Sequence, residues 1–349
     1  MKKRTKKKLL GVLYIIFAAV VAPLLIFVFY SLSLLNKQIQ KNEILVKISK
    51  NATTRTIVEE FNKYGALQPK ELFVPLIRAY SFATGKIPVA GTYKFSNYFR
   101  NIDIIRAIFS GRQLYTVKVT YPEGITIKDF ARITQKELGI DVDSFYKAIE
   151  EGNYVKKLNI PINSIEGYLM PETYFFYYGT DAENVVRKLI ETQNRIWEEK
   201  FEGVCKKMGI SRHFVLTLAS IIELESPLKE ERKRISGVFY NRLQKGMKLE
   251  SDPTVQYALN SKKRIRFEDL DVDNLYNTYK HEGLPPGPIC SPGVSSIEAA
   301  IYPEKHNFLY FVAYGDGSGR HRFARTFEEH LKNKALYKRE LKKQISATK

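Results

Sequence analysis

An apolar segment near the N-terminus constrains this chain more than any other feature of its sequence. Leu9–Leu35 is almost uninterrupted in hydrophobic residues and follows a cluster of six lysines and arginines. A helix of this length, at about 1.5 Å per residue, exceeds the roughly 30 Å hydrocarbon core of a bilayer. A secretory signal peptide would have an apolar core of about 7–15 residues and a small-residue cleavage site. The sequence therefore favours an uncleaved membrane anchor over a signal peptide.

The basic cluster predicts the direction in which this anchor crosses the membrane. Lysines and arginines beside a membrane helix stay on the cytoplasmic side. We therefore expect a cytoplasmic tail at 1–8, a transmembrane helix at 9–35, and the rest on the external or periplasmic side. No second apolar run in the sequence approaches spanning length, which predicts a single-pass protein of the cell (inner) membrane.

The chain is strongly basic, with a net charge of +19. Because most of this charge would face outward, we expect no nucleic-acid partner. An anionic membrane surface or cell-wall polymer matches the charge better, and simple solubility explains it equally well. Cys205 and Cys290 would lie where disulfides can form, and the sequence leaves their pairing open.

The external part predicts an α+β fold in two pieces. A strand and helix at 46–61, a strand from Val89 and a helix at Ile102–Phe109 form a small α+β module. A similar strand–turn–helix unit begins at Val117, and in both units a threonine precedes the helix. Whether this is a true repeat stays open.

The longer remainder reads as a mainly helical α+β domain that ends in a β-hairpin with a glycine-rich turn at 315–319. Helices are expected at about Asn184–Lys207, Ser211–Glu225 and Arg232–Lys245, and a short one after Asp252.

Glu223 and Glu225, at the end of one of these helices, are the strongest catalytic candidates. Positions i and i+2 lie about 200° apart around a helix, so the two carboxylates point in different directions. Glu225 lies three residues beyond Ile222 on the apolar stripe of the helix. A carboxyl held against apolar neighbours has a raised pKa, as a general acid near neutral pH requires. Alternatively, both acids are solvated or paired with the basic run at 229–234.

Other chemistries find less support in the sequence. There is no HExxH motif, no pair of CxxC motifs and no histidine–carboxylate cluster at metal spacing, so we expect no metal and no cofactor. Cys290 and His321 could form a Cys–His nucleophile, but no signature surrounds Cys290. Glu166 is a reserve acid.

Five motifs in a fixed order give the chain a resemblance to a known family. They are EGYLMPETY (Glu166–Tyr174), LASIIELES (Leu218–Ser226), VFYNRLQKGMKLESDPTVQYAL (Val238–Leu259), YNTYKHEGLPPGPICSPG (Tyr276–Gly293), and FVAYGDGSGRHRF with EEH (Phe311–Phe323 and Glu328–His330). The chain resembles the endolytic murein transglycosylases, the MltG/YceG-like family, across nearly all of its external part. The resemblance implies a LysM-like subdomain at 44–115 and a YceG-like catalytic domain at 116–349.

The resemblance also implies a reaction. It is cleavage of the MurNAc–GlcNAc β-1,4 bond within peptidoglycan glycan strands without water, leaving a 1,6-anhydroMurNAc end. One acid can suffice, because it first protonates the leaving oxygen and then accepts the proton of the C6 hydroxyl. The implied role is termination of nascent strands at the cytoplasmic membrane, with peptidoglycan synthases as partners. A non-catalytic peptidoglycan-binding scaffold and a hydrolytic muramidase are the alternatives.

Both acids belong to the family motif, so the resemblance alone does not choose between them. Glu225 is favoured by its place on the apolar stripe and by its similarity to the catalytic Glu-Ser of lysozyme-like lytic transglycosylases. Glu223 is the alternative or a supporting acid. Candidates for substrate binding are Asn241, Gln256, Tyr257, Asn277, Tyr279 and His321. Amides can bind acetamido groups and tyrosines can stack on sugars, although each residue could instead hold the local fold.

Overall fold

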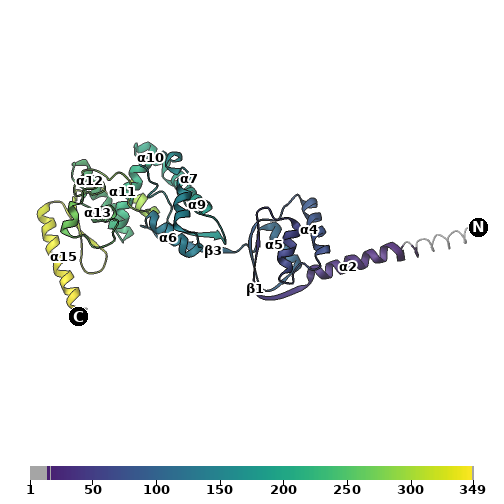
Figure 1. Ribbon diagram of the computed structural model, residues 1–349. Coiled ribbons are helices and arrows are strands. Elements are labelled where there is room, and N and C mark those ends of the chain that lie inside the picture. Colours follow the sequence, from purple (N-terminus) through teal and green to yellow (C-terminus); the bar gives the residue numbers. More distant parts are fainter. Residues whose placement is uncertain (1–13, 16, 348–349) are drawn as a thin grey trace, which may run out of the picture. The chain divides into compact units, whose positions relative to one another are not determined.

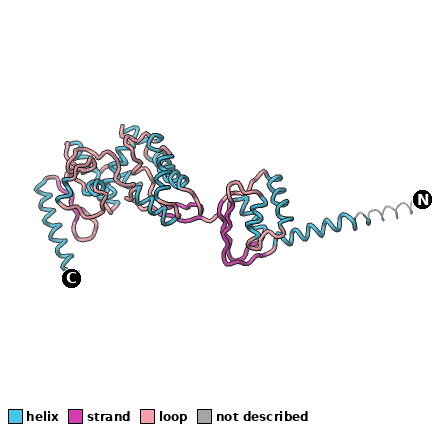
Figure 2. The backbone as a smooth tube through the Cα atoms, in the orientation of Figure 1, coloured by secondary structure: helices cyan, strands magenta, loops and turns pink. Residues whose placement is uncertain are grey.

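The computed structural model describes residues 14, 15 and 17–347. These residues form mainly helices, with three small two-stranded sheets (Figures 1 and 2), which confirms the mainly helical α+β class. They divide into two compact units. The first extends to Val117 and includes Phe176–Gly179, and the second contains Lys118–Phe175 and Thr180–Lys349.

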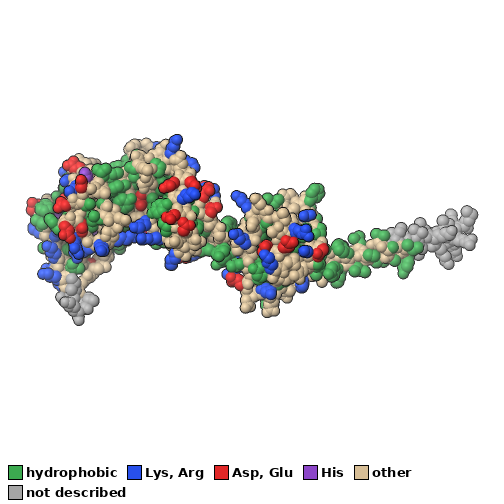
Figure 3. All heavy atoms as spheres, in the orientation of Figure 1, with side chains coloured by type: hydrophobic (Ala, Val, Ile, Leu, Met, Phe, Trp, Pro, Cys, Tyr) green, Lys and Arg blue, Asp and Glu red, His purple; other side chains and the backbone are tan. Residues whose placement is uncertain are grey.

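A long apolar helix lies at the N-terminus of the described chain. A π-helical turn, η1 (Phe17–Val21), continues into α2 (Ala22–Asn36). Together they span 20 residues, an 18-residue window of which has a mean hydropathy of 2.4, and hydrophobic side chains cover much of their surface (Figure 3). Among the described residues this is the one helix long and apolar enough to cross a membrane. The predicted tail at 1–8 and the start of the predicted 9–35 span lie outside the described residues.

The first unit packs a two-stranded sheet with three helices around one apolar core. Its elements are β1 (Gln38–Ile48), α3 (Thr54–Asn62), α4 (Lys70–Thr84), β2 (Gly91–Arg100) and α5 (Asn101–Ser110). The strands are antiparallel, from the pair Gln38–Arg100 to the pair Ile48–Gly91. As the sequence predicts, Thr53 caps α3 by accepting a hydrogen bond from the backbone N–H of Thr56.

The end of α2 is fastened to this unit. Lys37 alone separates α2 from β1, and Leu34 and Leu35 pack against the core. The buried Asn101 donates from Nδ2 to the Leu34 carbonyl at 2.8 Å and accepts at Oδ1 from the Leu67 backbone N–H at 2.8 Å. One side chain therefore holds the helix end and a buried loop together.

The second unit is built mostly of helices. Its helices are α6 (Ile127–Leu138), α7 (Val142–Glu151), α8 (Tyr154–Lys157), α9 (Ala182–Lys200), α10 (Glu202–Met208), α11 (Arg212–Glu225), η2 (Lys229–Glu231), α12 (Arg232–Gln244), α13 (Asp252–Ala258), η3 (Phe267–Asp271), α14 (Val294–Ile301) and α15 (Phe327–Ala347). Strand β5 (Tyr310–Ala313) pairs with β6 (His321–Ala324) in this unit, whereas the residues of the remaining strand pair, β3 (Thr116–Thr120) and β4 (Thr173–Tyr177), are divided between the two units. The expected C-terminal hairpin and the four expected helical regions are confirmed, while α4, α14 and α15 are additional.

Helix α11 forms the centre of the second unit. Ser211 caps its start, and every residue from Val215 to Ile222 is buried. The helix contacts α12, α13 and α14. The sequence predicted an apolar stripe along one side, but the structure buries this stretch on all sides. The stripe therefore does not show which of Glu223 and Glu225 is the better candidate for the acid. Their hydrogen-bond partners must decide this.

We predict that Asn101→Ala lowers the free energy of unfolding by about 2 kcal/mol, because it leaves the buried Leu67 N–H without a partner. Urea unfolding of the full chain in detergent measures this. Asn36→Ala is the matched control, since the exposed Asn36 amide bonds only within its own helix. Equal losses in both variants would contradict the role given to Asn101.

Candidate active site

Glu223 belongs to a buried ionic network that joins three helices. Arg232, the first residue of α12, donates to its two carboxylate oxygens at 2.6 and 3.3 Å. Both side chains are only 5% exposed. The backbone N–H of Gly293, which caps the start of α14, donates to the same carboxylate at 2.9 Å. Arg232 also contacts the Ser295 hydroxyl and lies 3.7 Å from Glu123. The Glu223 carboxylate thus connects α11, α12 and α14 through its hydrogen bonds.

Glu225 has a very different environment. Its Oε1 accepts a hydrogen bond from the hydroxyl of Ser251 at 2.5 Å, and no ion pair to it is found within the described residues. The carboxyl group is buried, although the residue as a whole keeps partial exposure. Glu225 is therefore a desolvated acid with one neutral hydrogen-bond partner.

The pKa of Glu225 is raised to about 7, mainly by burial and in smaller part by the nearby negative charge of Asp252. The Ser251 hydrogen bond and the charge of Arg242 act in the opposite direction. A carboxyl with this pKa is present in both protonation states near neutral pH. It can therefore donate a proton and later accept one.

Ser251 is itself held in place by buried hydroxyl groups. Its backbone N–H donates to the Thr278 hydroxyl at 3.0 Å, and the Thr254 hydroxyl donates to its carbonyl at 2.7 Å. The preceding residue, Glu250, has a φ of 51°, the left-handed region that residues other than glycine rarely occupy. Hydrogen bonds and the backbone conformation before it therefore fix the position of the serine that contacts the candidate acid.

Tyr279 is the predicted substrate-binding residue that lies closest to this chemistry. Its hydroxyl donates to Asp252 at 2.6 Å. Burial and the charges of Asp252, Glu225 and Glu250 raise the pKa of Tyr279, so its hydroxyl stays protonated. The structure therefore brings Tyr279 and Glu225 into one electrostatic cluster.

The side-chain amides of the three predicted Asn and Gln residues donate hydrogen bonds to backbone carbonyls of the protein itself. Asn241 donates to the carbonyls of His306 and Phe308 at 2.8 and 2.9 Å. Asn277 is fully buried and donates to two backbone carbonyls of the 270–272 segment. Gln256 donates to the carbonyl of Lys263 at 2.9 Å. In this structure these amides shape loops rather than face a ligand.

Tyr257 and His321 also have internal partners. The ring of Tyr257 lies against Tyr276, with centroids 4.8 Å apart. His321, on β6, bonds through Nδ1 to the carboxylate of Glu231 at 2.8 Å and is not part of the Glu225 cluster. Cys290 is a free, buried thiol whose Sγ donates to the Ser220 carbonyl, so the structure shows no Cys290–His321 pair and no Cys205–Cys290 disulfide.

The residues that distinguish the two acids were not recognised from the sequence. Arg232 stood out only as part of a basic run, Asp252 only as the start of a helix, and Ser251 only as one position of a motif. The motif around Ser251 was a signal, but its link to Glu225 is a tertiary contact. The reserve acid Glu166 lies elsewhere: it accepts from the backbone N–H of Ile127 at the start of α6, and burial raises its pKa to about 8.

Fold and site together define a mainly helical domain whose central helix, α11, ends in a buried carboxyl group that can be protonated near neutral pH. A model of the YceG-like family matches residues 46–336. The chain belongs to this family.

Named relatives agree with this membership. An endolytic murein transglycosylase of Bacillus subtilis is 34% identical over 85% of each chain. A Streptococcus pneumoniae protein of the same name is 27% identical over 70% of this chain and half of its own length. The crystal structure of a YceG-like protein from Listeria monocytogenes has a TM-score of 0.58 and 33% identity, and the match covers 84% of this chain and 99% of that one.

We predict opposite effects of the two amide substitutions on stability at pH 8. Glu223→Gln should lower the free energy of unfolding by about 3 kcal/mol, because it leaves Arg232 buried without its main partner. Glu225→Gln should raise it by about 2–3 kcal/mol. The folded-state pKa of Glu225 is raised, so its ionisation destabilises the fold progressively between about pH 4.5 and pH 7.

Urea unfolding of both variants at pH 4.5 and pH 8 measures these effects. The gain in Glu225→Gln should be present at pH 8 and nearly absent at pH 4.5, where Glu225 is protonated anyway. A loss of stability in Glu225→Gln at pH 8 would show that its carboxylate is stabilised by the fold.

Proposed function

We propose that this protein is an endolytic lytic transglycosylase of peptidoglycan. It cleaves the MurNAc–GlcNAc β-1,4 bond within a strand and leaves a 1,6-anhydroMurNAc end. The observation that carries the proposal is the buried Glu225 carboxyl, whose pKa of about 7 suits alternating proton donation and acceptance. The names of the relatives, endolytic murein transglycosylase, support the same reaction.

In the first step, protonated Glu225 donates its proton to the glycosidic oxygen as the bond to the anomeric carbon breaks. The oxocarbenium-like centre is stabilised by the neighbouring 2-acetamido group of the sugar. The Glu225 carboxylate then takes the proton of the C6 hydroxyl as that oxygen attacks the anomeric carbon. Because Ser251 holds Oε1, Oε2 is the oxygen that exchanges the proton with the substrate.

The hydrolytic alternative also has a specific observation in its favour. Asp252 is near enough to Glu225 to raise its pKa, so a second carboxylate lies in the site after all. A hydrolase needs such a partner as base or nucleophile. Asp252, however, accepts a hydrogen bond from Tyr279 at 2.6 Å, which fits a charge that orients the site better than a free base.

We further propose that the apolar helix is an uncleaved anchor with its N-terminus in the cytoplasm. Residues 44–115 would then form a LysM-like subdomain and 116–349 the catalytic domain, both outside the cytoplasmic membrane. This location, where new glycan emerges, suits termination of strand elongation beside peptidoglycan synthases. Asn241, Gln256, Tyr257, Asn277, Tyr279 and His321 remain proposed substrate residues, with Tyr279 the best supported by position.

Digestion of purified glycan strands by the full chain in detergent, followed by mass spectrometry, tests the reaction. We expect 1,6-anhydroMurNAc ends, and Glu225→Gln should lower the rate about 10³-fold through loss of the general acid. If the wild type instead produces reducing ends and Asp252→Asn produces none, the protein is a hydrolase. Intact strands would identify a scaffold.

The pH dependence of kcat/KM tests the role of Ser251. Activity needs protonated Glu225, so it should fall above about pH 7. The Ser251 bond lowers the pKa of Glu225, so Ser251→Ala should move this fall to higher pH. Ser236→Ala is the control, because Ser236 is buried and its hydroxyl has no hydrogen-bond partner in the described structure. If the pH dependence of kcat/KM in Ser251→Ala is the same as in the wild type, Ser251 does not influence the acid.

A further inference from the structure

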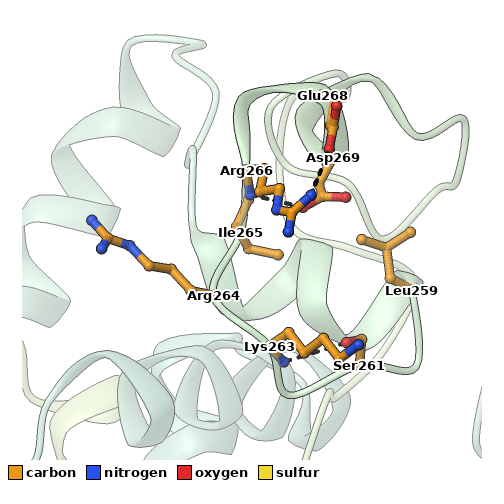
Figure 4. A pocket seen from close by; sticks show the side chains of 8 residues that line it. All are labelled: Leu259, Ser261, Lys263, Arg264, Ile265, Arg266, Glu268 and Asp269. Carbon is orange, nitrogen blue, oxygen red and sulfur yellow. Dashed lines mark hydrogen bonds and ion pairs between the residues drawn. The ribbon is translucent and has the colours of Figure 1, made fainter.

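A basic pocket of about 810 Å³ lies beside the loop that follows α13 (Figure 4). Lys263, Arg264 and Arg266 line it together with two acids, Glu268 and Asp269, and neither acid of α11 does. Two apolar residues, Leu259 and Ile265, also line it. The pocket thus combines positive charge with a small apolar surface.

Two of the three cations are available to a ligand. Arg266 lies 3.3 Å from Glu268, so its charge is partly neutralised. The exposed side chains of Lys263 and Arg264 have no ion-pair partner among the described residues. Asp269, which accepts a hydrogen bond from the backbone N–H of Arg266, also lines the pocket and offsets part of this charge. An anion that enters the pocket would therefore meet a small excess of positive charge.

The loop that carries these cations is held at both sides. Gln256, on α13, donates to the carbonyl of Lys263 at 2.9 Å. Lys262 bonds to Asp129, in the first turn of α6, at 2.9 Å. These contacts fix the backbone of the loop before a ligand arrives, which lowers the entropic cost of binding.

One short helix, α13, connects the partner of the candidate acid to the first residue of the pocket. Helix α13 begins directly after Ser251, the partner of Glu225, and ends one residue before Leu259. Its seven residues rise about 10 Å. An extended peptide covers that length with about three residues. A short peptide attached to a sugar beside Glu225 is therefore long enough to reach the cations.

We propose that this pocket binds the carboxylates of the peptide stem carried by the muramic acid residue next to the cleaved bond. The inference rests on the proposed function and adds a substrate preference to it, namely peptide-bearing over bare strands. Lysine and arginine are the side chains suited to carboxylates. Leu259 and Ile265 suit the small apolar side chains of a peptide, whereas a polyanionic wall polymer offers no apolar group to contact.

The test compares kcat/KM of the full chain on peptide-bearing strands and on strands stripped by an amidase. Stripped strands keep a carboxylate on each lactyl group, so general attraction of anions acts on both substrates. We expect Lys263→Ala/Arg264→Ala to lower the ratio of peptide-bearing to bare cleavage about tenfold. The control Lys188→Ala/Lys207→Ala removes the same charge from exposed positions on α9 and α10 and should leave the ratio unchanged.

An unchanged ratio in Lys263→Ala/Arg264→Ala, or an equal loss on both substrates, would overturn the proposal. Competition by polyglycerol phosphate but not by free stem peptide would also overturn it and assign the pocket to a wall polymer.

A binding measurement separates this inference from the proposed function. Fluorescence anisotropy with a labelled stem peptide and the Glu225→Gln chain should show binding that Lys263→Ala/Arg264→Ala weakens about tenfold. If the wild type cleaves no strand but the peptide binds in this way, the proposed reaction is wrong and the pocket assignment stands. If strands are cleaved but no peptide binds, the pocket assignment alone is wrong.

Discussion

The buried ion pair between Glu223 and Arg232 is the interaction on which the rest of the site depends. It ties the last turn of α11 to the first residue of α12, and the N–H of Gly293 adds the start of α14. Desolvation of two charges is costly, so such a pair persists only when further hydrogen bonds satisfy it. The bond from Gly293 and the contact to Ser295 meet this requirement. The end of α11 is thereby fixed in direction.

Because that helix end is fixed, the two acids of one motif are held in different environments. Glu223 receives hydrogen bonds from a guanidinium group and a backbone N–H. Glu225, two residues further on, receives one hydroxyl group and is otherwise desolvated. Environment rather than residue type therefore distinguishes the two carboxyl groups of this motif. The contacts of Glu223 fix the helix end and thereby make the position of Glu225 reproducible.

The sequence predicted the local features of this arrangement and missed those that depend on the tertiary fold. Helical phase correctly required that Glu223 and Glu225 point in different directions. It could not show that α11 is buried on every side, or that Ser251, 26 residues away, would meet Glu225. The amides of Asn241 and Asn277 illustrate the same limit. Their residue type suits a sugar ligand, but backbone carbonyls brought near by folding occupy them.

The junction between α2 and β1 limits where the first unit can lie. One residue, Lys37, separates the helix from the strand, and a single residue spans at most about 3.6 Å. Asn101 and the packing of Leu34 and Leu35 remove the remaining freedom at this point. If α2 lies in a bilayer, the first unit must therefore lie at its surface.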